Sequence, residues 1–165
     1  MTIDRGSFWK AALLIAWLGA TSSQGADFDQ GRVISGDRAV LPWRDRPAVE
    51  NRVLTERLNR LLPALMKEAG IDMWLVIARE YVEDPVYFSL VPQPTFAARR
   101  TTMLVFYNGP EGFEKLSVNR YPLGDPYDTA WAGGDLDAQW QGLAALVVEK
   151  NPMRIGINTS RDWPF

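Results

Sequence analysis

The sequence contains no histidine and no cysteine among its 165 residues. Without imidazole or thiolate groups, the chain cannot form a Ser-His-Asp or Cys-His catalytic system or a zinc site built on nitrogen and sulfur ligands. It also cannot form a disulfide, so its stability must come from packing. The chemistry that remains is that of carboxylates, amines, guanidinium groups and phenols.

The chain also lacks a strong excess of charge of either sign. Lys and Arg total 18 against 20 Asp and Glu, which gives a net charge of -2. Binding to the phosphates of nucleic acid requires clustered positive charge, so nucleic acid is not an expected partner. With 47% hydrophobic residues, the chain is long and apolar enough for one globular domain with a substantial core.

Residues 1–25 have the pattern of a secretory signal peptide. Arg5 and Lys10 precede an apolar run over residues 11–20, and small residues around Ser23 and Gly25 resemble a cleavage region. The run is shorter than the roughly 20 residues that a membrane-spanning helix needs, so a membrane anchor is the weaker alternative. We therefore expect an exported protein, periplasmic or extracellular, without stable membrane insertion.

The rest of the chain divides at a change of pattern near residue 46. Residues 26–46 are polar and interrupted by glycine and proline, which predicts a linker or an extended arm. Residues 47–165 alternate between helical and strand patterns, which predicts an α/β domain with a mixed sheet and flanking helices.

The first half of this domain predicts a helix followed by a central strand. Apolar residues recur at helical spacing from Val53 to Met66, and we expect Pro63 to kink this amphipathic helix and Gly70 to cap it. Residues 73–78 form an unbroken apolar run, which is typical of a strand covered on both faces.

The second half predicts two paired strands, a helix and a last strand. Residues 101–107 and 115–121 alternate like an antiparallel pair joined by a turn. A helix capped by Asp135 or Asp137 should end before Asn151, and a short strand over residues 153–158 should follow. The apolar residues expected on this helix are Trp140, Leu143, Leu146 and Val147.

Five ordered blocks of sequence carry a resemblance to a known family. They are Leu-Leu-Pro at 61–63 with Gly-Ile-Asp-Met-Trp at 70–74, Arg-Glu-Tyr-Val-Glu-Asp-Pro at 79–85, Ala-Arg-Arg-Thr-Thr at 98–102, Asn-Arg-Tyr at 119–121, and Pro-Met-Arg-Ile-Gly-Ile-Asn at 152–158. Together they resemble the N-terminal domain of exported Xaa-Pro aminopeptidase-like metallopeptidases of the creatinase/prolidase, or pita-bread, group. The resemblance covers about residues 41–163.

The resemblance implies a ribonuclease H-like fold and a homo-dimer. In proteins of this group a following pita-bread domain is the catalytic one, and its two Asp, one His and two Glu bind two divalent metals, manganese or zinc. No residue here matches one of those ligands, and the sequence stops at Phe165 near the expected start of that domain. We therefore expect no cofactor and no catalytic residue in this chain, which would be inactive alone as a fragment, a truncated product or an autonomous domain.

Two groups of residues are candidates for contact with a substrate or partner. Arg79, Glu80 and Tyr81 directly follow the expected central strand, at the edge where open α/β sheets bind ligands. The alternative is a charged loop that is simply solvated. Arg99 and Arg100 would form a guanidinium clamp for a carboxylate, and the alternative for them is structural salt bridging.

The acidic residues between Asp125 and Asp137 lack the spacing and the closing Glu of a calcium-binding EF-hand loop, so we interpret them as a solvated turn and a helix cap.

Two candidate functions remain for the chain. The first is a non-catalytic domain of an Xaa-Pro aminopeptidase-like hydrolase that contributes dimer contacts and walls of the substrate cleft. The second is a free-standing exported module that binds an anionic or peptide ligand through Arg79, Arg99 and Arg100.

Overall fold

The structure is a computed structural model and describes residues 33–35 and 38–159. The chain divides into two units, Met1–Val40 and Leu41–Phe165. In the first unit, β1 (Val33–Ser35) pairs antiparallel with β2 (Arg38–Val40). This strand pair falls within the predicted arm, residues 26–46, and the predicted signal peptide, residues 1–25, lies outside the described residues.

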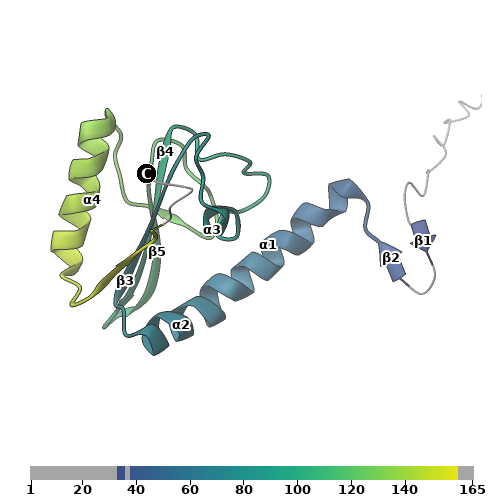
Figure 1. Ribbon diagram of the computed structural model, residues 1–165, viewed down its shortest axis with the longest axis horizontal. Coiled ribbons are helices and arrows are strands. Elements are labelled where there is room, and N and C mark those ends of the chain that lie inside the picture. Colours follow the sequence, from purple (N-terminus) through teal and green to yellow (C-terminus); the bar gives the residue numbers. More distant parts are fainter. Residues whose placement is uncertain (1–32, 36–37, 160–165) are drawn as a thin grey trace, which may run out of the picture. The chain divides into compact units, whose positions relative to one another are not determined.

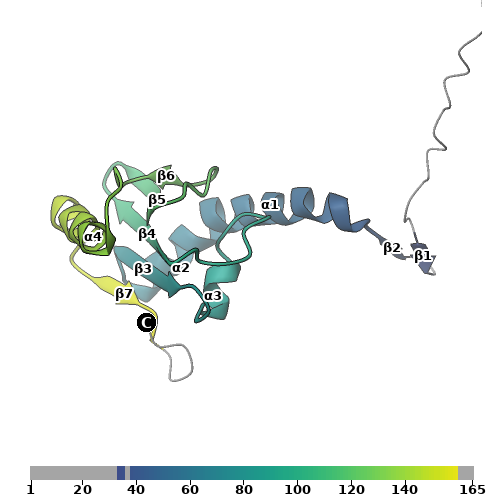
Figure 2. The ribbon, with the colours of Figure 1, turned by 90° about the horizontal axis from the view of Figure 1, so that it is seen from above.

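The second unit is a mixed five-stranded sheet with helices on both faces (Figures 1 and 2). The strand order is β6-β5-β4-β3-β7, in which β3, β4 and β5 are antiparallel neighbours and β7 runs parallel to β3. This arrangement confirms the predicted α/β class with a mixed sheet. In chain order the elements are η1 (Trp43–Asp45), α1 (Arg46–Glu56), η2 (Arg57–Leu61), α2 (Leu62–Ala69), β3 (Met73–Arg79), α3 (Pro85–Phe88), β4 (Thr101–Gly109), β5 (Gly112–Asn119), β6 (Asp128–Thr129), α4 (Leu136–Lys150) and β7 (Ile155–Ile157).

The long helix predicted around Val53 to Met66 is interrupted at residues 57–61, just before Pro63. Proline has no N–H to donate to the carbonyl four residues earlier, so the α-helical ladder cannot continue through it unchanged. The chain responds with a π-helical turn, η2, in which the N–H of Leu62 donates to the carbonyl of Arg57. The structure therefore shows a widened turn between α1 and α2, while the kink expected at Pro63 stays a prediction.

Gly70 ends α2 in the left-handed conformation, with φ 65° and ψ 33°, as predicted. The N–H of Ile71 then donates to the carbonyl of Met66 at 3.0 Å, which closes the cap. This turn brings the chain directly into β3.

Replacing Gly70 with alanine should lower the free energy of unfolding by about 1 kcal/mol, because a side chain disfavours the left-handed region. The added Cβ would also lie 2.9 Å from Nη1 of Arg154, which must shift. Urea unfolding of the full chain measures the change. Glu68→Ala, at an exposed position of α2, is the control and should stay within about 0.5 kcal/mol. A Gly70→Ala loss no larger than that of the control would contradict the role of the cap.

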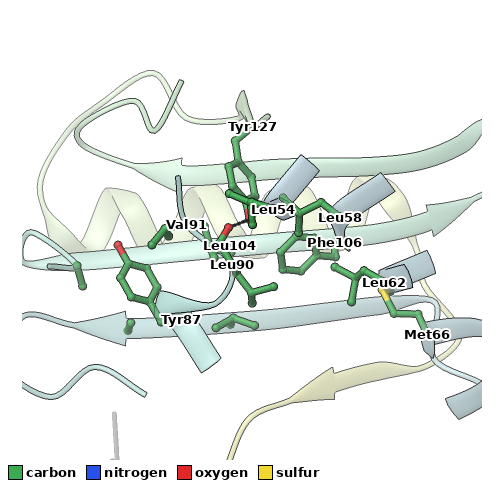
Figure 3. Packing of buried hydrophobic residues seen from close by; sticks show 13 residues of the cluster. Leu54, Leu58, Leu62, Met66, Tyr87, Leu90, Val91, Leu104, Phe106 and Tyr127 are labelled. Carbon is green, nitrogen blue, oxygen red and sulfur yellow. Dashed lines mark hydrogen bonds between the residues drawn. The ribbon is translucent and has the colours of Figure 1, made fainter. Parts of the chain in front are cut away.

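The sheet separates two cores, as the unbroken apolar run of β3 predicts. Val76 and Ala78 face one core, and Met73 and Ile77 face the other. The first core lies under α1, α2 and α3, and Figure 3 shows how its side chains pack around Phe106. The second core lies under α4 and consists of Met73, Ile77, Met103, Val105, Leu116, Val118, Leu143 and Leu146.

Helix α4 begins and ends where the sequence predicts. The Asp135 carboxylate caps it by accepting from the N–H of Ala138 at 2.8 Å, and Asn151 ends it with φ 45°. The prediction of which α4 residues face the core is partly wrong, because Trp140 is 40% exposed whereas Gln139 is only 5% exposed. No helix in residues 38–159 is long and apolar enough to cross a bilayer.

Candidate functional site

All five residues singled out from the sequence line one hollow of about 350 Å³. Arg79, Glu80 and Tyr81 reach it from the carboxyl end of β3, and Arg99 and Arg100 reach it from the segment just before β4. Antiparallel pairing of Arg79 with Thr101 brings these two segments to the same edge of the sheet. The other lining residues are Thr101, Arg120, Trp131, Gly134, Asp135, Leu136 and Gln139.

Three of these residues hold a backbone conformation that side chains normally avoid. The φ angles are 73° at Tyr81, 45° at Arg99 and 75° at Arg100. Such conformations cost of order 1–3 kcal/mol each and are found where surrounding structure imposes them, often at binding sites. The described residues contain one other non-glycine position with positive φ, Asn151, at the end of α4.

Glu80 ties the two strained segments together. Its backbone N–H donates to the carbonyl of Arg100 at 2.7 Å, and its carboxylate accepts from the N–H of Arg100 at 3.0 Å. The carboxylate of Glu80 is therefore engaged by the backbone rather than by a guanidinium group. Its role in the hollow is to position Arg100.

The hollow concentrates positive charge, although the chain as a whole is slightly acidic. Its lining includes Arg79, Arg99, Arg100 and Arg120, and none of the four forms a salt bridge within residues 38–159. Salt bridging, the alternative considered for Arg99 and Arg100, is thus not observed in the described part of the chain. Tyr81 is 90% exposed, which agrees with the solvated-loop alternative, and it also lines the hollow.

Two of the guanidinium groups are held in place by neutral partners. Arg99 lies 4.4 Å over the ring of Tyr121, a cation–π contact. Arg120 donates from Nη2 to the carbonyl of Gly134 at 2.8 Å, which leaves its other donors available. The positive end of α4, which begins at Leu136, adds to the same field, while its cap Asp135 partly offsets it.

Gln139 connects the strands beneath the hollow. It donates both hydrogens of its amide, to the carbonyl of Thr101 at 3.0 Å and to the carbonyl of Val118 at 2.8 Å. These carbonyls lie at the start of β4 and near the end of β5, immediately beside the segments that carry Arg100 and Arg120. Gln139 therefore adds a side-chain link between the ends of two strands that already pair with each other.

The sequence analysis missed Arg120, Trp131 and Gln139. A signal existed for Arg120, because it directly follows β5, just as Glu80 directly follows β3. The strands β3 and β5 run in the same direction and end at the same edge of the sheet. No local signal marked Gln139, since a glutamine beside a tryptophan on a helix is ordinarily the more exposed of the two.

The lining offers guanidinium donors and a phenol but no pair of a nucleophile with a general base. Guanidinium groups recognise carboxylates and other oxyanions through paired N–H donors. Such a site can bind and orient an anion. Among the described residues, no group of three or more Asp or Glu lies close enough together to hold a metal ion.

No protein-family model, curated protein or solved structure matches this chain. The resemblance to the creatinase/prolidase group therefore depends on the five sequence blocks alone.

Proposed function

We propose that this chain is a non-catalytic α/β module that holds an anionic group, a carboxylate of a peptide or of a partner protein, in the arginine hollow. The observation that carries the proposal is the gathering of Arg79, Arg99, Arg100 and Arg120 around one hollow without a salt bridge to any of them in residues 38–159. Unpaired guanidinium groups that share a concave site attract and orient oxyanions.

The five sequence blocks give this module a context. We propose that it is the accessory domain of an exported Xaa-Pro aminopeptidase-like hydrolase, where the hollow walls part of the substrate cleft or contacts the dimer mate. A ribonuclease H-like fold is supported by the three consecutive antiparallel strands, β3 to β5, followed by α4 and by β7, which returns parallel to β3. In this proposal the two divalent metals belong to the pita-bread domain.

A free-standing binding module is the second candidate, favoured because all lining residues come from residues 79–139 of one unit. The two candidates differ in how complete the site is. Micromolar affinity of the chain alone for a small dicarboxylate favours the free-standing module. Millimolar affinity favours a surface that a partner domain completes.

Arg79→Gln and Arg100→Gln should each weaken the binding of succinate to the full chain at least tenfold, or about 1.4 kcal/mol. The loss follows from removing a charged donor from the hollow, and wild-type binding should weaken as salt is added. Isothermal titration calorimetry measures both effects. Arg60→Gln is the matched control. Arg60 lies on η2, does not line the hollow, and forms a salt bridge of 3.2 Å with Glu56. Absence of succinate binding, or an equal loss in the control, would contradict the proposal.

The chain alone, supplied with Mn²⁺ or Zn²⁺, should not hydrolyse Xaa-Pro dipeptides, because its described residues bring no metal-ligand set together. A chromatographic assay for free proline measures this. Hydrolysis that a chelator abolishes would refute the assignment of a non-catalytic role.

A further inference from the structure

A second hollow, of about 350 Å³, lies at the same end of the sheet. Thr102 and Asn119 line it and are paired across β4 and β5. Thr102 follows Thr101 of the arginine hollow, and successive strand residues point to opposite faces. The two hollows therefore lie on opposite faces of the sheet, and Arg99 lines both.

One residue that lines this hollow, Asn119, carries a buried polar atom without a partner among the described residues. Asn119 is only 4% exposed, and its Oδ1 accepts no hydrogen bond in the described residues. Its Nδ2 donates to the carbonyl of Tyr121 at 2.7 Å, so exchanging the two amide atoms would place oxygen against oxygen. The orientation of the amide is therefore determined, and Oδ1 is a buried acceptor that a bound donor would satisfy.

The two buried hydroxyl groups of the hollow already donate to backbone carbonyls. Tyr87 donates to the carbonyl of Ala97 at 3.2 Å, and Thr102 donates to the carbonyl of Ala98. Burial raises the pKa of Tyr87, so its phenol remains a neutral donor at physiological pH. Among the described side chains, Asn119 Oδ1 is the buried acceptor that is left without a hydrogen bond, so a bound N–H group would gain most by donating to it.

Rings form the outer wall. Phe96 is 81% exposed and Tyr121 is 43% exposed, and both line the hollow together with Pro94, Pro122 and Leu123. Exposed rings beside a concave apolar surface favour a ligand with an apolar group. The Arg99 guanidinium, stacked over Tyr121, places a positive charge at the rim.

We propose that the second hollow binds the C-terminal residue of a peptide whose last side chain is apolar. The apolar side chain packs against Phe96 and the prolines, the N–H of that residue donates to Asn119 Oδ1, and the terminal carboxylate binds Arg99. This inference rests on the proposed function, because it assigns the anionic group to one of the same arginines. Beyond the proposed function, the inference names the class of ligand and adds a binding surface on the opposite face of the sheet.

Calorimetry with the full chain and three small probes tests the arrangement. N-acetyl-L-phenylalanine has the apolar group, the N–H and the carboxylate, N-acetyl-L-phenylalaninamide lacks the carboxylate, and 3-phenylpropionate lacks the N–H. We expect the first probe to bind at least tenfold more tightly than either of the others. Equal binding of N-acetyl-L-phenylalanine and 3-phenylpropionate would overturn the role of Asn119.

Two variants locate the site. Phe96→Ala removes an exposed ring and should weaken N-acetyl-L-phenylalanine at least fivefold, while Asn119→Ala should abolish its preference over 3-phenylpropionate. If Asn119→Ala does not fold, the comparison of the three probes on the wild-type chain and the Phe96→Ala variant still test the proposed site. Unchanged binding by Phe96→Ala would overturn the proposal.

Succinate separates this inference from the proposed function. Its binding should be unaffected by Phe96→Ala and reduced by Arg79→Gln. If succinate binds in that manner and N-acetyl-L-phenylalanine shows no preference, the inference fails and the proposed function stands. If succinate does not bind while the three phenyl probes keep their expected order, the proposed function fails instead.

Discussion

Phe106→Ala should lower the free energy of unfolding by about 3–5 kcal/mol, the largest loss expected from a single substitution in this chain. Phe106 is fully buried on β4 and packs within the first core (Figure 3). Its ring centroid lies 5.5 Å from that of Trp74 and 6.0 Å from that of Tyr127. Truncation would leave a cavity where the sheet, α1 and the loop before β6 meet. Small domains are stable by only about 5–15 kcal/mol, so this change consumes much of the total.

The control for Phe106→Ala is Phe96→Ala, the same chemical change at a ring that is 81% exposed. It should alter stability by no more than about 0.5 kcal/mol. Phe106→Leu, which keeps most of the apolar volume, should fall between the two and remains measurable if the alanine variant does not fold. Urea unfolding curves of equal midpoint for the Phe106→Ala and Phe96→Ala variants would contradict the described core.

Gln139→Leu should lower the free energy of unfolding by about 3 kcal/mol, because the carbonyls of Thr101 and Val118 would each lose a buried donor. The same substitution should also weaken succinate binding, since the ends of β4 and β5 next to Arg100 and Arg120 would lose their shared side-chain link while the strands stay paired. Thermal unfolding and calorimetry measure the two effects.

The matched control is Gln141→Leu, two residues further along α4 at an exposed position. It should leave both stability and succinate affinity nearly unchanged. A Gln139→Leu variant as stable as Gln141→Leu would show that the amide does not connect β4 and β5.

The strands and caps of the second unit were predictable because their signals are local. The apolar run of β3 indicated a strand covered on both faces, and two separate cores confirm it. Gly70 and Asp135 were predicted as caps from their position at the ends of helical patterns, and both serve as caps. For the two caps the deciding interaction spans only a few residues, and for β3 the apolar run is itself the signal.

The features that sequence analysis missed depend on contacts between distant segments. Gln139 is buried because two strand carbonyls, of Thr101 and Val118, meet beneath α4, and helical periodicity alone favoured Trp140 for that face. The two-residue strand β6 forms only because Asp128 and Thr129 meet β5. Arg79 and Arg99 were singled out separately, and only the antiparallel register of β3 and β4 brings them to one hollow.

The most direct test of the arginine hollow is a ¹H–¹⁵N spectrum of the full chain recorded during a succinate titration. The proposed function predicts saturable shifts in the backbone amides of residues 79–82 and 99–101 and in the Nε–Hε signals of arginines, and loss of these shifts in Arg79→Gln. A spectrum that does not change, or shifts confined to α1 and the loop of residues 88–93, would contradict it.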